Sequence, residues 1–357
     1  MTRQAFVHRI AAASPDDVSG LKTAFEEGRI DRSAIVAVFG KTEGNGCVND
    51  FTRALASRAL KDLLGPKPCL VMSGGTEGGL SPHFLVFEVR EVSTAPAPRA
   101  LAVGRARTSP LPPEHLGRGA QVDAVAECVK VAMEDAGLKS PEQVHLVQVK
   151  CPLLTSDRIA EAAARGKTTA TRDTLKSMGL SRAAASLGIA VALGEVNRAK
   201  ISETAIGTDW SLFSSRASAS AGVELAGHEI VVLGHGEGWA GPLRIDHAVM
   251  TDAIDIEPVR DALARLGLEA NGQLRPAQRM RLKALIAKTE AASTGAIRGL
   301  RHTMLNDSDI SPTRHARGFT AGALAGLVGH TELYVSGGAE HQGPDGGGPV
   351  AVIVEAT

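Results

Sequence analysis

Ala284-Leu-Ile-Ala-Lys288-Thr-Glu290 is a short apolar run that ends in lysine, threonine and glutamate, and Ala37-Val-Phe-Gly-Lys41-Thr-Glu43 repeats it near the N-terminus. A third run, Leu146-Val-Gln-Val-Lys150, keeps the apolar residues and the lysine but lacks Thr-Glu. Short apolar runs of this kind are typical of buried strands. An internal repeat is stronger evidence for a fold than any single motif. We therefore infer that one strand ending in lysine occurs three times.

Each lysine is followed by a helical stretch of small residues that contains an arginine, and then by a second apolar strand that ends in serine. The arginines are Arg53, Arg182 and Arg317, and the serines are Ser73, Ser214 and Ser336. The distance from lysine to serine differs among the three copies, which excludes a short-period solenoid. The order lysine, arginine, serine predicts a divergent triplication of a domain-sized unit.

Stretches rich in proline or glycine suggest where the units meet. Pro-rich stretches occupy 93–99 and 109–113, and a Gly-rich stretch occupies 234–242. Such residues mark connections between regular elements. We predict units at residues 1–100, 112–245 and 252–357. Strands and helices alternate irregularly, so the expected fold class is α+β.

Composition excludes several classes of function. Lys plus Arg (39) equals Asp plus Glu (39), so no bulk field attracts nucleic acid or an anionic membrane. Aromatic residues make up 3%, too few for a base-stacking surface. No apolar stretch approaches the length of a membrane span, and the four cysteines form no CxxC pair. We expect a globular cytoplasmic protein that handles a small molecule.

The repeated residue types suggest a chemistry if the three units converge on one point. Neighbouring ammonium groups lower one another's pKa, and a neutral lysine can act as general base on a serine. Backbone N–H groups at Ser-Gly turns can stabilise an oxyanion, and arginine adds bidentate recognition of planar polar edges. Two alternatives stay open at this point: the repeats preserve only packing, or the serines are ordinary turn formers.

Five stretches carry a resemblance to a known family. They are residues Ser73–His83, Lys150–Asp157, Phe213–Ser220, Arg298–Asp309 and Ser336–Gly348. Together they resemble the ring-opening amidohydrolases, and the resemblance runs over nearly the whole chain. It implies three similar units around a pseudo-threefold axis, with a central β-barrel-like core, helices outside and the active site at the centre. It also implies a homo-oligomer, namely a tetramer.

The same resemblance implies which residues act. Lys150 of the middle unit would be the general base and Ser214 the nucleophile, with Ser215 as a close rival because the alignment there rests on one residue of register. In this middle unit Ser214-Ser215 replaces Ser-Gly and Lys150-Cys151 replaces Lys-Thr, so the symmetry is broken there. With Ser214 and Ser215, the residues expected to bind the ring are Lys41, Arg53, Ser73, Gly74, Arg182, Lys288, Arg317, Ser336 and Gly337.

The implied substrate is a small planar cyclic imide. Cyanuric acid, an s-triazine, alternates three C=O and three N–H groups and therefore matches a triplicated set of donors. Its hydrolysis gives carboxybiuret, which loses carbon dioxide to give biuret. Ring opening of barbituric acid is the alternative activity. A binder without catalytic activity on the same scaffold is the alternative of a different class.

No organic cofactor is expected, but a structural cation is. Gly236-Glu-Gly238-Trp-Ala-Gly241 fits GxGxxG, yet Pro242 follows and no helix opens there, so the dinucleotide fingerprint fails. The histidines show no zinc-binding spacing, so no catalytic transition metal is expected. The family resemblance implies a structural Mg²⁺ or Ca²⁺ ion held by Glu290, Ala339, Gln342, Gly343, Pro344 and Gly347.

Overall fold

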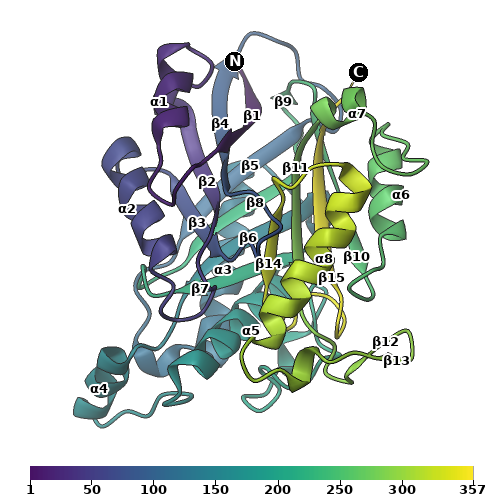
Figure 1. The fold of residues 1–357 in the computed structure, drawn as a ribbon. Helices are drawn as coiled ribbons and strands as arrows, with labels where there is room; N and C mark the ends of the chain where they lie inside the picture. Colours follow the sequence, from purple (N-terminus) through teal and green to yellow (C-terminus); the bar gives the residue numbers. More distant parts are fainter. Residues whose placement is uncertain (357) are drawn as a thin grey trace.

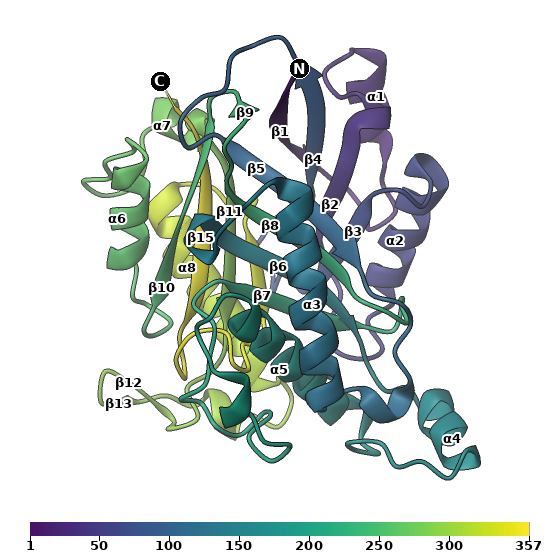
Figure 2. The ribbon, with the colours of Figure 1, turned by 180° about the vertical axis from the view of Figure 1, so that it is seen from behind.

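The computed structural model describes residues 1–356 and has mixed α and β structure, with sheets inside and helices outside (Figures 1 and 2). The first sheet has the strand order β3-β2-β4-β1-β9. Its strands are β1 (Thr2–Ala11), β2 (Ile35–Thr42), β3 (Cys69–Gly74), β4 (His83–Val92) and the short β9 (Trp239–Ala240).

The second and third sheets have four strands each. The second has the order β5-β8-β6-β7, with β5 (Leu101–Arg107), β6 (Val144–Pro152), β7 (Ala217–Gly222) and β8 (Glu229–His235). The third has the order β10-β15-β11-β14, with β10 (Leu243–Met250), β11 (Leu282–Thr289), β14 (Tyr334–Gly337) and β15 (Gly348–Glu355). A separate two-stranded ribbon joins β12 (Ala296–Ile297) and β13 (Leu300–Arg301).

Apart from β9, the three sheets share one topology. In each, the first and second strands both pair antiparallel with the fourth, and the second pairs parallel with the third. The lysine runs identified in the sequence form the second strand every time, namely β2, β6 and β11. We call each sheet with its helices the first, second and third unit.

Helices cover the outer face of each sheet. They are α1 (Ser19–Glu26) and α2 (Phe51–Leu64) on the first, α3 (Gly119–Ala136) and α5 (Thr174–Ala192) on the second, and α6 (Glu257–Arg265) and α8 (Pro312–Val328) on the third (Figures 1 and 2). Two further helices, α4 (Ser156–Ala164) and α7 (Pro276–Arg281), are short. Each helix in residues 1–356 is too short or too polar to traverse a lipid bilayer.

Alternation along the strands gives each sheet two apolar faces. In β2, Ala37 and Phe39 belong to a core that all three sheets share, whereas Val38 belongs to a separate core beneath α1 and α2. In β11, Ile286 joins the shared core and Leu285 joins a core beneath α6 and α8. Successive side chains of a strand point to opposite faces, so near-continuous apolar runs are required here.

The predicted β-barrel-like core is wrong. No sheet in residues 1–356 closes into a barrel, because the inner faces of the three sheets meet through side chains and not through a continuous hydrogen-bonded ladder. The α+β class is confirmed, whereas the pseudo-threefold axis and the tetramer stay predictions.

The boundaries of the units stay predictions, and the strands can be placed against them. The second sheet begins with β5 at Leu101 and the third with β10 at Leu243, before the predicted starts at 112 and 252. The sequence predicts that the Pro-rich stretch at 109–113 connects the first and second units. It follows β5 and lies within the second unit, between that strand and α3.

Candidate active site

The three predicted lysines lie at the ends of equivalent strands and point inward. Lys41, Lys150 and Lys288 are each at most 1% exposed. In the parallel pairing of second and third strands, Lys41 stands opposite Ser73 and Lys288 stands opposite Ser336, as the sequence suggested. The residue opposite Lys150 is Ser220. Lysine and serine therefore share one face of the sheet in every unit.

Ser214, predicted as the nucleophile, does not occupy the equivalent position. It precedes β7 and forms an isolated bridge with Gln342, and its hydroxyl accepts a hydrogen bond from the Arg216 N–H at 3.1 Å. Its rival Ser215 donates its hydroxyl to Glu195. Both serines are tied to structure away from Lys150, so the sequence alignment was shifted by six residues in the middle unit.

Each lysine ammonium donates to a backbone carbonyl in another unit, and the three contacts run cyclically. The carbonyl belongs in each case to the residue before the neighbouring unit's serine. Lys41 reaches Val335 O at 2.6 Å, Lys150 reaches Met72 O at 2.6 Å, and Lys288 reaches Ala219 O at 2.8 Å. A ring of equivalent hydrogen bonds thus links first to third, second to first, and third to second unit.

Lys41 and Lys288 also contact their serines, with Nζ to Oγ distances of 3.4 and 3.2 Å. Burial lowers the pKa of both ammonium groups far below the usual value, and neighbouring arginines lower it further. Burial lowers the pKa of Lys150 as well, but there the strongest influence after burial is a carboxylate, which raises the pKa, whereas at Lys41 and Lys288 it is an arginine. The three lysines are equivalent in position and unequal in charge environment.

Lys150 owes this difference to Glu224, whose Oε1 lies 3.1 Å from its Nζ. Burial alone would raise the pKa of Glu224, but Lys150 and Arg53 hold it below the usual value. The corresponding glutamates of the other units turn away from lysine and bind arginine in two-pronged ion pairs, Glu77 with Arg317 and Glu340 with Arg182. The symmetry is broken in the middle unit.

The three predicted arginines reach the site from the helices. Arg53 lies in the first turn of α2, which Asp50 caps by accepting from the Thr52 N–H. Its guanidinium donates to the carbonyls of Ala221 at 3.1 Å and Cys47 at 2.6 Å. Arg182 and Arg317 come from α5 and α8. Backbone carbonyls therefore hold the guanidinium group of Arg53, and glutamates hold those of Arg182 and Arg317.

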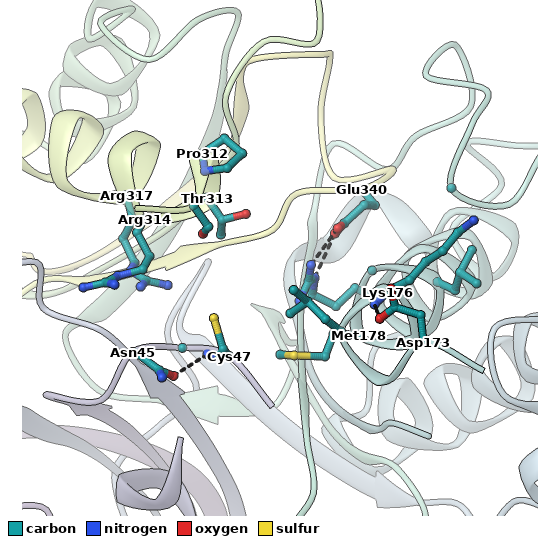
Figure 3. Close-up of a pocket in the computed structure, with 17 residues that line it drawn as sticks. Asn45, Cys47, Asp173, Lys176, Met178, Pro312, Thr313, Arg314, Arg317 and Glu340 are labelled. Carbon is teal, nitrogen blue, oxygen red and sulfur yellow. Dashed lines mark hydrogen bonds and ion pairs between the residues drawn. The ribbon is translucent and has the colours of Figure 1, made fainter. Parts of the chain in front are cut away.

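The three serines that stand opposite the lysines, Ser73, Ser220 and Ser336, line a small cavity. Its lining comes from all three units and comprises Gly46, Arg53, Ser73, Gly74, Met178, Arg182, Ser220, Ala221, Arg317, Ser336 and Gly337. A wider pocket shares Gly46, Met178, Arg182 and Arg317 with it. Figure 3 shows this pocket, with Asn45 and Cys47 on one side, Met178 and Lys176 on another, and Arg314 and Arg317 on the third. The wider pocket therefore adjoins the small cavity.

The residues predicted to hold a cation gather beside this cavity. Glu290 follows β11 directly and is part-buried; its Oε1 accepts from the Ala291 N–H and its Oε2 from the Thr313 hydroxyl. The predicted loop follows β14, and the Gln342 side chain is already used, since its Oε1 accepts from the Ala219 N–H at 2.6 Å. A ligand from Gln342 would have to be its backbone carbonyl. One carboxylate with several carbonyls is a donor set that suits Mg²⁺ or Ca²⁺.

Sequence reasoning missed Ser220 and the glutamates. The signal was present: Ser73-Gly-Gly-Thr-Glu77, Ser220-Ala-Gly-Val-Glu224 and Ser336-Gly-Gly-Ala-Glu340 share the pattern Ser-x-Gly-x-Glu. Aligning this pattern, and not the first serine after an apolar run, identifies the correct register.

Comparisons with known proteins agree over the full length. A family model described as amidohydrolase ring-opening protein matches residues 6–355. A cyanuric acid amidohydrolase of Bradyrhizobium sp. (strain ORS 375) is 61% identical over 99% of both chains. The crystal structure of a cyanuric acid hydrolase from A. caulinodans superposes with a TM-score of 0.92 at 61% identity, covering 99% of this chain and 100% of that one. A second solved cyanuric acid hydrolase, described as an innovation by structural concatenation, gives a TM-score of 0.94 at 47% identity with full coverage of both.

Proposed function

The chain belongs to the family of ring-opening amidohydrolases and is an amidohydrolase, and from this premise we propose that it opens the ring of cyanuric acid by hydrolysis. The observation that supports the substrate most strongly is the cyclic set of lysine-to-carbonyl contacts around one cavity. Cyanuric acid presents the same polar edge three times, so equivalent groups from each unit can each meet one edge.

We also propose that the three units are related by a pseudo-threefold axis through this cavity. Two kinds of contact support the axis independently of the strand order. The lysine hydrogen bonds run from each unit to the next in one direction, and the pairs Glu77–Arg317 and Glu340–Arg182 join the same units in that direction. Such agreement is expected of a symmetric cage and not of three independent packings.

In the proposed reaction the Ser220 hydroxyl attacks one ring carbonyl while Lys150 accepts its proton. The negative oxygen of the tetrahedral intermediate is stabilised by polar groups lining the cavity. Collapse breaks the ring C–N bond, and Lys150 returns the proton to the leaving nitrogen. Water then cleaves the acyl-serine to give carboxybiuret, which loses carbon dioxide to give biuret. Ser73 and Ser336, with Lys41, Lys288 and the arginines, hold the remaining edges.

Lys150 suits the role of general base because of its carboxylate partner. A general base is most effective when its pKa lies near the working pH. Burial, aided by neighbouring arginines, drives the pKa of Lys41 and Lys288 far below the usual value, and Glu224 opposes the effect of burial at Lys150. Glu224 also stabilises the ammonium that forms when Lys150 takes the serine proton. Serine, lysine and glutamate thus act as nucleophile, base and counter-ion.

We propose that the predicted structural Mg²⁺ or Ca²⁺ is held by Glu290 and by backbone carbonyls of Ala339, Gln342, Gly343, Pro344 and Gly347. The donor set is right for a hard cation, since it combines one carboxylate with neutral oxygens. When bound, the ion supplies charge that orders the loop after Ser336. Its role is to hold one wall of the cavity, and no step of the reaction passes through it.

Parallel assays on cyanuric and barbituric acid test the proposed function. We expect kcat/KM for cyanuric acid to exceed that for barbituric acid by about ten- to hundredfold, because a CH₂ edge leaves a buried polar group unpaired at a cost of about 1–3 kcal/mol. Biuret should accumulate as cyanuric acid disappears. A higher kcat/KM for barbituric acid would show that barbituric acid is the substrate. Binding of either ring without turnover would show that the protein is a binder and not an enzyme.

A further inference from the structure

Three histidines and an aspartate meet where the second and third sheets adjoin, away from the active site. His145 comes from β6, His235 from the end of β8, and Asp246 and His247 from β10. His145 precedes Lys150 by five residues on the same strand, which places it about 16 Å away at the usual rise of a strand. The proposed reaction uses none of these four residues.

Three ligand atoms of this group face one another. His145 Nδ1 lies 2.9 Å from His247 Nδ1 and 3.5 Å from Asp246 Oδ1, and the last two atoms are 4.0 Å apart. A tetrahedral site with bonds of about 2.0 Å separates its ligand atoms by about 3.3 Å. The observed separations bracket this value, so one ion can reach all three atoms with small side-chain adjustments.

The outer nitrogen of His145 is already engaged as a metal ligand requires. His145 Nε2 lies 3.0 Å from His235 Nδ1. If Nε2 carries the proton and donates to His235, then Nδ1 of His145 keeps its lone pair for the shared point. Histidine ligands generally donate their second nitrogen to such a partner, which fixes the tautomer and ring orientation. His235 is thus an orienting residue.

The local charges favour a dication. Asp246 supplies the carboxylate of the group, and its Oδ1 also accepts from the His247 N–H at 2.7 Å. Arg265 occupies only Oδ2, at 2.6 Å, and leaves Oδ1 toward the histidines. The positive charges of Arg216 and Arg265 act on His247 and oppose cation binding in part.

We propose that His145, Asp246 and His247 bind a divalent transition-metal ion of the zinc type between the second and third sheets. Imidazole ligands select zinc, nickel or copper over magnesium and calcium. The His247 side chain is 27% exposed, which gives the ion a path and leaves a fourth position for water. By joining β6 to β10, the ion would stabilise the contact between two units.

Zinc titration of metal-stripped, untagged protein tests the site. Calorimetry with Zn²⁺ should be run in excess Mg²⁺, which saturates sites made of oxygen ligands. We expect one site of micromolar affinity or tighter, weakened at least a hundredfold in His247→Ala and in Asp246→Asn. His235→Ala should weaken it by about ten- to hundredfold, as loss of an orienting partner does. Crystals soaked in zinc should give an anomalous peak among the three ligand atoms.

The matched control is His115→Ala, an exposed histidine outside the group. It should bind zinc like the unchanged protein, and circular dichroism should show that every variant is folded. Absence of zinc binding by the unchanged protein, an anomalous peak elsewhere, or equal loss of affinity in His115→Ala would overturn the proposal.

Discussion

The pairing of Lys150 with Glu224 is the residue-scale feature on which the proposed chemistry depends most. Burial and neighbouring arginines lower the pKa of Lys41 and Lys288 far below the usual value, and the carboxylates that act on these two lysines oppose the shift only in part. Lys150 alone has a carboxylate within 3.1 Å. If three similar units surround the substrate and only one carbonyl is attacked, one unit must differ from the other two. The ion pair of Lys150 with Glu224 is such a difference.

Glu224→Gln should lower kcat and move the acidic limb of kcat/KM to lower pH. The base must be neutral, so activity rises with pH through the pKa of Lys150. Glu224 favours the protonated lysine and raises that pKa, so its removal lowers the pKa, by about one pH unit for a charge this close. The measurement is a pH profile of kcat/KM. Glu77→Gln is the control, and the acidic limb of its kcat/KM profile should lie at the same pH as in the unchanged protein. An equal shift of the acidic limb in Glu77→Gln would refute the role of Glu224.

At the same scale, the sequence predicts the positions of the lysines and arginines around the cavity but not that of the serine opposite Lys150. Lys150 could be predicted because it ends an apolar run that resembles two others. Ser214 was chosen because it too follows an apolar pair, Leu212-Phe213. The strand register sets Lys150 against Ser220, and the pattern Ser-x-Gly-x-Glu points to the same serine. A serine after an apolar pair is a weaker guide to register than this longer pattern, because register depends on backbone pairing across distant segments.

Among the elements, the close packing of β5 on α3 explains a glycine that the sequence left without a role. A Cβ on Gly104 would lie 2.1 Å from the Ala132 carbonyl and 2.4 Å from the Ala136 nitrogen, both backbone atoms of α3. Neither atom can move without shifting the helix. The helix therefore lies as close to the second sheet as it does only because residue 104 has no side chain.

Gly104→Ala should destabilise the protein by about 1–3 kcal/mol or more, the usual cost of overpacking. Gly79→Ala is the matched control, since nothing lies within 4 Å of its added Cβ. The free energy of unfolding in urea should fall for the first variant and change little for the second. Equal stability of the two variants would mean that β5 and α3 can separate freely.

The loop after β14 is the element whose order we ascribe to the structural cation. Glu290→Gln removes the carboxylate and keeps the shape, so cation binding should weaken while activity falls only in part. Because the loop adjoins Ser336, the loss should fall mainly on KM. Chelation of the unchanged protein should reproduce the effect, and added Mg²⁺ should reverse it. Full activity after complete removal of bound metal would contradict this account of the loop.

For the whole molecule, the three strands that carry the lysines could be predicted from the sequence, whereas the packing of the sheets could not. Apolar runs ending in lysine revealed three strands, and their positions in β2, β6 and β11 agree. The expected barrel failed because three separate sheets share one core, to which Phe39, Leu146 and Ile286 each contribute. Side-chain packing between sheets leaves no periodic mark in the sequence. The histidine group was invisible for the same reason, since its members come from three strands.

The most direct test of the central claim compares kcat for alanine substitutions at the serines of the cage. We predict that Ser220→Ala and Lys150→Ala each lower kcat by three orders of magnitude or more, and that the double variant is no worse. Ser214→Ala should stay within a few-fold of the unchanged protein, and Ser73→Ala and Ser336→Ala should mainly raise KM. Near-normal kcat in Ser220→Ala, with the large loss in Ser73→Ala or Ser214→Ala, would contradict the assignment of the middle unit's Ser220 as nucleophile.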